Sequence, residues 1–277
     1  MIFARDKSQM CNNLLQFAHV YAWGRKHHQR VISMRFSYKY PYFEIQNTRY
    51  ANFFWYLFAK YAAALRLLHT VSFRYADHRE EKIHYMETHS HFVVSGWNAR
   101  FYDEFLEYRD EICNLFRLRE EYAAPLRNRM ETAMFGTSAD TLRLGLHIRR
   151  GDYKEFYDGK FFYDNATYAA YVMEYARQNA AKNIVIFIST NDRTVSAHDF
   201  EVLCQNCQNT IKFIVMPENN PAQDLIMLSE CDAIIGPPST FSLTACMYHD
   251  IPLCWMEEAS TENMRFDKFE NQFKNIR

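Results

Sequence analysis

The sequence predicts an α/β protein of two lobes with a cleft between them, and three observations support this fold class. Short apolar runs alternate with helix-favouring segments over the C-terminal half, which is typical of right-handed βαβ units and a doubly wound sheet. The segment Gly-Thr-Ser-Ala-Asp at 136–140 interrupts this pattern, so we place the boundary between residues 138 and 139. The chain has 277 residues, of which 48% are apolar, enough for two domains of ordinary size.

The C-terminal lobe, residues 139–277, has the clearer pattern. The continuous apolar run Ile-Val-Ile-Phe-Ile at 184–188 is typical of a strand buried in a parallel sheet. The whole pattern predicts strands at 142–148, 184–188, 213–215, 233–235 and 252–254, and helices at 165–180, 194–205, 221–230 and 240–248.

The N-terminal lobe, residues 1–138, has a weaker pattern. Helical periodicity predicts helices at 12–28 and 109–134, and short apolar runs predict strands at 31–34 and 92–94. The aromatic and apolar segment 50–68 predicts a further helix, which we expect to be buried.

Composition restricts the class of protein. The net charge is −1, so no overall field attracts nucleic acid or a membrane surface. No apolar run approaches the length of a membrane span, and no secretory signal begins the chain. Its seven cysteines, an odd number, fit free thiols in a reducing compartment. We therefore expect a cytoplasmic protein. Basic side chains outnumber acids in residues 1–50, which fits an anionic ligand or a solvated basic face.

Metal binding is not expected. Cys204 and Cys207 have the spacing of metal ligands but lack a second Cys or His pair nearby. His84, His89 and His91 cluster in the sequence without supporting Cys or acidic residues, so we interpret them as solvated or capping histidines.

The run His147-Ile-Arg149-Arg150-Gly-Asp152-Tyr directly follows a predicted strand. Ligands of open α/β sheets bind beyond the carboxyl ends of the strands, and the planar guanidinium suits phosphate. The run therefore indicates an anion site. Two alternatives remain: a surface turn with a glycine at positive φ, or the Arg-Gly-Asp tripeptide that adhesion receptors recognise, if the loop projects into solvent.

A second group of polar residues lies one βαβ segment away. Asp224 falls in the first turn of a predicted helix, and Ser239 and Thr240 begin the next helix after a buried strand. Hydroxyls and free backbone N–H groups at a helix N-terminus favour anions. Ordinary helix capping is the alternative, but together with the two arginines the group favours phosphate binding.

These segments resemble a known family. The run from His147 to Tyr153 is similar to the shared motif of α-1,2-, α-1,6- and protein O-fucosyltransferases. The order of the later segments is most similar to glycosyltransferase family 11, the α-1,2-fucosyltransferases: Phe161-Phe162-Tyr163, Ile188-Ser189-Thr190-Asn191-Asp192, Asp224-Leu225-x-Met227-x-Ser229 and Ser239-Thr240-Phe241-Ser242. The segment 12–18, Asn-Asn-Leu-Leu-Gln-Phe-Ala, is similar to that family's opening motif.

The resemblance implies a GT-B-like fold of two Rossmann-type lobes, with residues 1–138 on the acceptor side and 139–277 binding the nucleotide sugar. It implies GDP-fucose as donor, a glycan hydroxyl as acceptor, α-1,2 linkage, inversion at the anomeric carbon, and no metal or other cofactor. The implied roles are Arg149 on the β-phosphate, Arg150 supporting the leaving diphosphate, Asp152 orienting the arginine loop, His147 against the nucleotide, Asp224 on guanine, Ser239 and Thr240 on phosphate, and Asn12 contacting the donor from the other lobe.

Three features depart from the family pattern. The loop 5–11 contains no glycine, Leu-Thr-Ala at 243–245 stands where the family usually has Trp-Trp-Gly, and residues 35–110 match nothing we recognise. The acceptor hydroxyl must lose a proton, and Asp152, Glu155 and Asp158 all remain candidates for the base.

Three other functions remain open at this stage. They are a transferase that uses another GDP-sugar such as GDP-mannose, a non-catalytic module that binds GDP or a glycan, and a protein whose 23 Phe and 19 Tyr form an oligomer interface.

Overall fold

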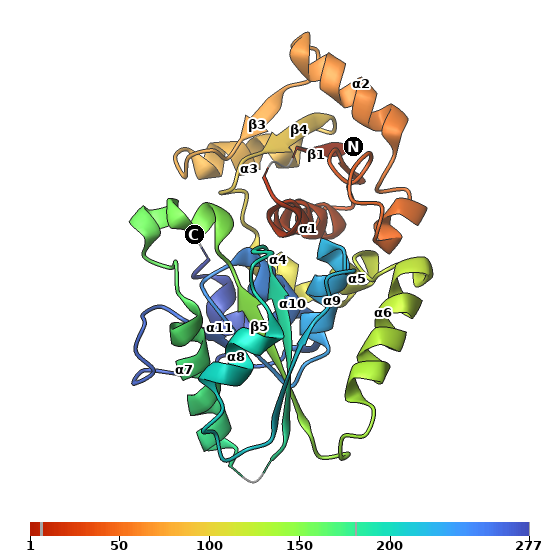
Figure 1. Ribbon diagram of the computed structural model, residues 1–277. Helices are drawn as coiled ribbons and strands as arrows, with labels where there is room; N and C mark the ends of the chain where they lie inside the picture. The colour runs from red at the N-terminus through yellow and green to blue at the C-terminus, as the bar shows by residue number, and fades with distance from the viewer. Residues whose placement is uncertain (6–7, 181, 277) are drawn as a thin grey trace. The chain divides into compact units, whose positions relative to one another are not determined.

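The computed structural model describes residues 1–5, 8–180 and 182–276, and it divides into two compact units, Met1–Arg119 and Glu120–Arg277. Each unit contains one parallel sheet with helices packed against it (Figure 1). The predicted α/β fold class is therefore confirmed. Asp6 and Lys7, in the loop without glycine, lie outside the described residues.

The first unit is built on a short parallel sheet with the strand order β2-β1-β4-β3. Its strands are β1 (Ile2–Arg5), β2 (Val31–Ser33), β3 (Thr70–Ser72) and β4 (Phe92–Ser95). Its helices are α1 (Met10–Lys26), α2 (Phe53–Ala64), α3 (Arg79–Thr88), α4 (Tyr102–Glu107) and α5 (Arg109–Leu115), with a 3-10 turn η1 at Glu44–Asn47.

Helix α2 corrects one prediction. It was expected to be buried, but its buried residues are Ala59 and Ala62, and Phe54 is 80% exposed. The two small side chains allow the helix to pack closely on Phe3 and Ile32 of the sheet. Aromatic composition alone was misleading, because here most of the large rings lie on the solvent side.

The second unit has a five-stranded parallel sheet of order β7-β6-β5-β8-β9. Its strands are β5 (Leu142–Ile148), β6 (Ile184–Thr190), β7 (Ile211–Val215), β8 (Ala233–Gly236) and β9 (Leu253–Trp255). Its helices are α6 (Glu120–Met134), α7 (Asn165–Gln178), α8 (Ala197–Leu203), α9 (Pro221–Ser229), α10 (Thr240–His249) and α11 (Phe269–Phe273), with 3-10 turns η2 (Gly151–Lys154) and η3 (Phe156–Gly159). All five predicted strands and the four helices predicted after residue 140 are present.

The boundary between the units lies earlier than predicted, after Arg119 rather than after residue 138. The predicted helix at 109–134 is two helices, α5 and α6, and α6 belongs to the second unit. One reason is a hydrogen bond at 2.7 Å from Arg129 Nη2 of α6 to Asn219 Oδ1. Charged helices on both sides of a short break gave one continuous pattern in the sequence.

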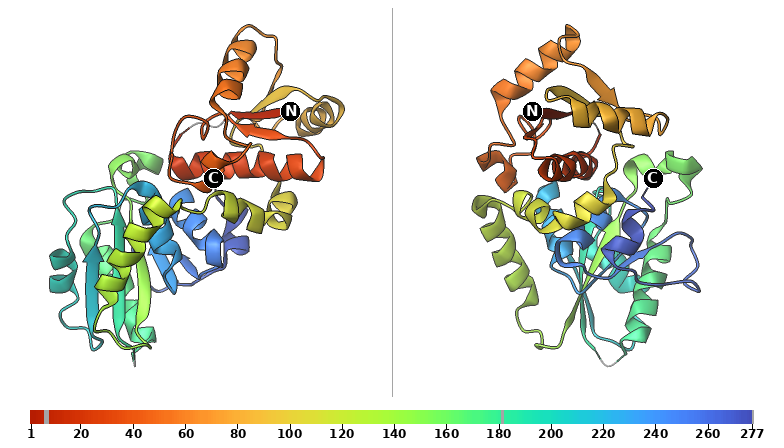
Figure 2. Two further views of the ribbon diagram at one scale, coloured as in Figure 1. Left: turned by 90° about the vertical axis from the view of Figure 1, so that its right-hand side faces the viewer. Right: turned by 180° about the vertical axis from the view of Figure 1, so that it is seen from behind.

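The second sheet has helices on both faces (Figures 1 and 2). Alternate residues of a strand point to opposite faces. Leu144 and Leu146 of β5 belong to the same core cluster as Val172 of α7. Gly145 faces the other side, where a Cβ would lie 2.9 Å from Leu228 of α9.

The strand order of the second sheet reverses between β5 and β8. From β5 the chain moves outward through β6 and β7, then returns to β8 and continues to β9. Such a switch point opens a crevice beyond the carboxyl ends of the two strands, and ligands bind there in open α/β sheets. The predicted phosphate-binding residues follow these two strands.

Candidate functional site

His147 is the last residue but one of β5, at the carboxyl end of the strand. Its register partner on β6 is Ser189, so both side chains point to the face covered by α9 and α10. The imidazole packs against Phe241 of α10, with ring centroids 5.0 Å apart. A Cβ on Gly236 would lie 2.9 Å from the His147 carbonyl oxygen, so glycine is required at the end of β8.

Burial makes His147 a neutral residue. Desolvation, together with the Arg149 charge, lowers the pKa of His147 to about 3. Its Nδ1 atom has no hydrogen-bond partner among the described residues. A buried polar atom without a partner is costly, and a ligand at the switch point could provide one.

Arg149 is held in place by a solvent-exposed carboxylate. Its Nε donates to Asp152 Oδ1 at 2.9 Å and its Nη2 donates to Asp152 Oδ2 at 2.8 Å. The Arg149 side chain is 19% exposed, whereas that of Asp152 is 58% exposed. An ion pair with so exposed a partner contributes little stability, so a phosphate could replace the carboxylate at small cost.

Arg150 is held far more completely than its neighbour. Its guanidinium donates to Asp192 Oδ2 at 3.2 Å, to the Tyr163 carbonyl at 3.2 Å and to Asn165 Oδ1. Its backbone N–H donates to Asn191 Oδ1 at 2.9 Å. Arg150 therefore fixes the loop to β6 and α7. These contacts are unfavourable for the adhesion reading, because receptor binding would need this guanidinium in solvent.

The turn after the arginines is joined to the loop that precedes α10. Gly151 has φ +27°, and a Cβ there would lie 2.6 Å from Asn191 Nδ2. The hydroxyl of Tyr153, in η2, donates to the Pro238 carbonyl at 2.6 Å. The arginine loop and the residues that follow β8 are thereby fixed to each other.

Ser239 and Thr240 lie where the sequence predicted them. Ser239 is the N-cap of α10, and its Oγ accepts a hydrogen bond from the Phe241 backbone N–H at 3.1 Å. Thr240 is the first residue of the helix. The N-terminus of α10 thus lies at the same sheet edge as the arginine loop, and its partial positive charge favours an anion.

Asp224 lies in the first turn of α9, as predicted, and is partly buried. Its Oδ1 accepts from Asn219 Nδ2 at 3.0 Å, and its Oδ2 accepts from Ser189 Oγ at 3.3 Å. Burial raises the pKa of Asp224 to about 6, although these two hydrogen bonds and the charge of Arg129 act to lower it. The carboxylate is desolvated and oriented, which prepares it to accept hydrogen bonds from a ligand.

The chain from Arg129 through Asn219 to Asp224 was missed by sequence reasoning. Arg129 orients the Asn219 amide from α6, and this amide in turn donates to Asp224. No motif marks either residue. The capping box of Asn220 and Gln223 that begins α9 is the nearest signal, because it places the preceding residue beside the first helical turn.

The remaining predicted residues are less closely tied to this edge. Asn12 lies in the first unit, in the first turn of α1, and its Nδ2 donates to Ser8 Oγ at 2.9 Å. Asp152 is engaged by Arg149, while Glu155 and Asp158 are exposed. None of the three is placed in a buried position that would identify it as the base.

Within the described residues, no group of three or more His, Cys, Asp or Glu is arranged to hold a metal ion. The departure at 243–245 is accommodated in the interior, because these residues of α10 are fully buried. No helix of the described part of the chain is long and apolar enough to cross a membrane.

The chain matches the family model described as Glycosyl transferase family 11 over residues 63–251. No curated protein sequence matches it.

Solved structures share its fold. A mutant of FUT1 from Arabidopsis thaliana in complex with GDP is 9% identical with a TM-score of 0.66, over 96% of this chain and 73% of that one. The fucosyltransferase NodZ from Bradyrhizobium is 13% identical with a TM-score of 0.62, over 96% and 98%. POFUT1 in complex with GDP-fucose is 10% identical with a TM-score of 0.59, over 90% and 94%.

Proposed function

This chain belongs to glycosyltransferase family 11, and on that premise we propose that it moves fucose from GDP-fucose to a hydroxyl group of a glycan, forming an α-1,2 linkage with inversion. The family and the fold together confirm the expected enzyme class, a glycosyltransferase of the fucosyltransferase type. The single observation that carries the donor assignment is the sheet edge at the switch point. Arg149 and the N-terminus of α10 follow the neighbouring strands β5 and β8 there, and Asp224 of α9 is hydrogen-bonded to Ser189 of β6.

The diphosphate end of the donor fits the arginine side of this edge. Cleavage of the glycosyl–phosphate bond places negative charge on the leaving β-phosphate. Fixed positive groups that meet this charge lower the barrier most when they are already oriented. Arg149 would exchange Asp152 for the phosphate, the N-terminus of α10 with Ser239 and Thr240 would donate hydrogen bonds to it, and Arg150 would keep the loop in place.

The guanine end of the donor fits Asp224. A carboxylate can accept both the N1–H and the exocyclic N2–H₂ of guanine. His147, neutral and packed against Phe241, offers an uncharged ring against the nucleotide. Asn12 would contact the donor from the first unit.

Inversion requires a single displacement. The acceptor oxygen attacks the anomeric carbon as the bond to the β-phosphate oxygen breaks, and the hydroxyl proton passes to a base. Two guanidiniums and a helix terminus provide positive charge without a divalent cation, so we propose a metal-independent reaction. The base is one of the acidic residues left open above.

The test is release of GDP from GDP-fucose by the purified chain, with GDP-mannose as competitor. The proposal requires turnover of GDP-fucose and only weak competition by GDP-mannose. Preferred turnover of GDP-mannose would identify a different donor. GDP binding without turnover of either sugar nucleotide would identify a non-catalytic module, and absence of GDP binding would contradict the donor site itself.

A further inference from the structure

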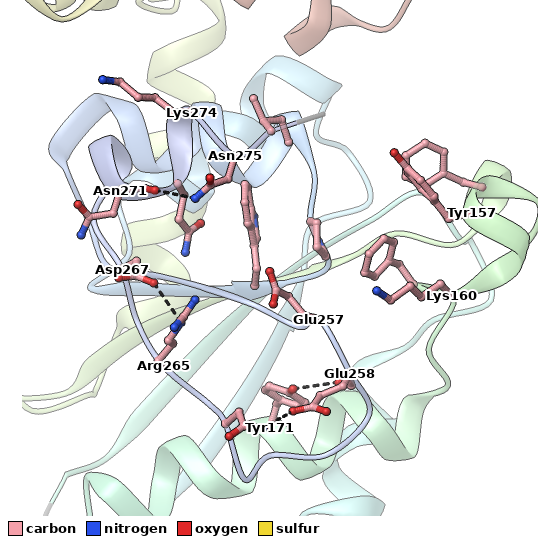
Figure 3. A pocket seen from close by; sticks show the side chains of 17 residues that line it. Tyr157, Lys160, Tyr171, Glu257, Glu258, Arg265, Asp267, Asn271, Lys274 and Asn275 are labelled. Atoms are coloured by element: carbon pink, nitrogen blue, oxygen red, sulfur yellow. Dashed lines mark hydrogen bonds and ion pairs between the residues drawn. The ribbon is translucent and has the colours of Figure 1, made fainter.

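The second unit contains a pocket of about 1250 Å³ beside the arginine loop (Figure 3). One wall is the segment 156–161, which continues the loop after η2, and the other is the C-terminal segment 255–276. None of the residues that we assign to the donor site lines it, although Pro238, which precedes Ser239, and Phe161 of the family motif do. It is therefore a separate space on the same unit.

Two stacked aromatic rings connect the pocket to the donor edge, by which we mean the sheet edge that carries Arg149, Ser239 and Asp224. Phe156 of the pocket wall stacks on Tyr153, with centroids 5.0 Å apart and an interplanar angle of 28°. Tyr153 in turn donates to the carbonyl of Pro238, which lines the pocket and precedes Ser239. A ligand in the pocket would lie next to the groups that we assign to the leaving diphosphate.

The charges around the pocket cancel. Its ionisable lining residues with charge at neutral pH are Lys160, Arg265, Lys274, Glu257, Glu258 and Asp267, which is three positive and three negative groups. Arg265 and Asp267 pair at 3.4 Å. This balance is unsuited to a second nucleotide, which would need an excess of positive charge. It suits an uncharged ligand that has many hydrogen-bonding groups.

Aromatic rings supply the apolar part of the lining. They belong to Phe156, Tyr157, Phe161, Tyr171 and Trp255. Tyr157 is 53% exposed, so its ring is available to a ligand. Rings that combine an apolar face with a polar edge suit ligands that are themselves amphipathic, and the C–H face of a sugar ring is such a surface.

Two buried polar atoms in the lining have no partner among the described residues. One is the indole Nε1 of Trp255, a donor, and the other is Oε1 of Gln272, an acceptor. The Gln272 side chain is only 6% exposed, and its Nε2 donates to the Leu253 carbonyl at 2.8 Å, which fixes the amide. A sugar hydroxyl both donates and accepts, so hydroxyl groups would satisfy both atoms.

We propose that this pocket binds uncharged sugar rings of the glycan acceptor. It would therefore hold the acceptor on the second unit, beside the donor residues, and not on the N-terminal lobe where the family resemblance placed the acceptor side. The assignment rests on the proposed function for the identity of the glycan as acceptor. The recognition of neutral sugars by the pocket stands on its lining alone.

Trp255 provides a direct probe, because the other three tryptophans of the chain, Trp23, Trp55 and Trp97, all belong to the first unit. The four indole N–H signals of the ¹⁵N-labelled full chain are followed by NMR during titration with lactose, cellobiose and maltose, and with glucuronic acid as a charged control. The Trp255→Phe variant assigns the signal. At least one neutral disaccharide is expected to shift the Trp255 signal to saturation, and glucuronic acid to shift it less.

Two pairs of variants test the lining. Tyr157→Ala and Glu257→Gln should each weaken the disaccharide by about fivefold or more, which corresponds to roughly 1 kcal/mol. Phe162→Ala and Glu262→Gln are matched controls, because both residues are exposed neighbours that do not line the pocket, and they should leave the affinity unchanged. No shift with any of the three disaccharides, or equal effects of control and lining variants, would overturn the proposal.

A kinetic measurement separates this proposal from the proposed function. With the bound disaccharide as acceptor, Glu257→Gln should raise the KM for the disaccharide and leave the KM for GDP-fucose unchanged. Saturable binding at Trp255 with no turnover of GDP-fucose would contradict the proposed function but support the pocket. Transfer to a disaccharide that causes no shift at Trp255 would contradict the pocket but support the proposed function.

Discussion

The two sides of the segment 149–161 have different chemistry. Toward the switch point it presents Arg149 beside a buried, neutral His147, and Asp224 lies at the same edge with a raised pKa. Toward the pocket it presents exposed rings and charges that cancel. The difference shows how one loop can serve two ligands: oriented charge for a diphosphate on one side, and amphipathic rings for a sugar on the other.

The same contrast divides the two adjacent arginines. Arg149 is held by one exposed carboxylate, whereas Arg150 is held by Asp192, Asn165 and the Tyr163 carbonyl. One is positioned to exchange partners and the other to stay in place. Substitutions of the two residues should therefore differ in kind.

The largest effect is expected from Arg149→Ala. Turnover of GDP-fucose should fall about a hundredfold or more, a loss of roughly 3 kcal/mol, because the charge that meets the leaving phosphate is removed. Arg149→Lys should restore little, because an ammonium does not reproduce the planar fork. GDP release is measured together with the thermal midpoint, which should stay near that of the wild type.

The matched control is Arg143→Ala, at the amino end of the same strand, where an exposed pair with Asp232 is lost. Its turnover should equal that of the wild type. Wild-type turnover in a folded Arg149→Ala protein would remove the distinction between the two sides of the loop.

The next effect concerns guanine. Asp224→Asn should weaken GDP binding by about 1.5–3 kcal/mol, the scale of hydrogen bonds to a charged group. UDP, which lacks the paired donors, should change much less. Calorimetric titration of both nucleotides into both proteins measures the difference. Equal GDP affinities would leave Asp224 as an acid that only complements the helix dipole.

Asp224 also predicts a pH dependence. Because burial raises the pKa of Asp224 to about 6, its carboxylate becomes protonated as the pH falls through 6. A protonated group accepts the guanine donors poorly, so GDP affinity should drop roughly tenfold between pH 7 and 5. The terminal phosphate of GDP titrates in the same range, so Asp224→Asn supplies the reference curve. If GDP affinity depended on pH in the same way in both proteins, the contact between Asp224 and guanine would be contradicted.

A stability effect is expected from Arg150→Ala. Removal of the guanidinium leaves Asp192 and Asn165 without this partner in a partly buried position, which should lower the free energy of unfolding by about 2 kcal/mol. Denaturant unfolding of Arg150→Ala, of Arg149→Ala and of the wild type measures the change in the free energy of unfolding. If Arg149→Ala were the more destabilising of the two, the roles drawn from their contacts would be reversed.

No effect is expected from chelation. The carboxylate of Asp192, which follows β6, is already engaged by Arg150 and Thr194, so it is poorly placed to ligate a cation bound to the diphosphate. Turnover is measured with excess chelator and again after addition of magnesium or manganese. Loss on chelation that the metal restores would show that arginine alone does not neutralise the phosphates.

The second unit was predictable because its strands are buried on both faces. Continuous apolar runs such as 184–188 are typical of strands buried in a parallel sheet. The order of these strands then brings His147, Asp224 and Ser239 to one edge of the sheet. In the first unit, β1 stands at the start of the chain without a flanking pattern, and β3 carries a single apolar side chain, Val71. Neither was predicted.

The side-chain contacts of the site were less predictable than its position. Nothing in the pair Arg149-Arg150 indicates that one is fully engaged and the other is not, because their partners come from three separate segments. The pocket was missed for a similar reason. Much of its lining comes from the irregular segment 256–268 and the short helix α11, where no period or motif marks the residues that converge.

The most direct test is a crystal structure of the chain with bound GDP. The β-phosphate should accept hydrogen bonds from the Arg149 guanidinium and from the N-terminus of α10, with Asp152 displaced and Arg150 still bound to Asp192. The guanine N1–H and N2–H₂ should point at the Asp224 carboxylate. GDP bound elsewhere, or bound here while Arg149 keeps both hydrogen bonds to Asp152, would contradict the account.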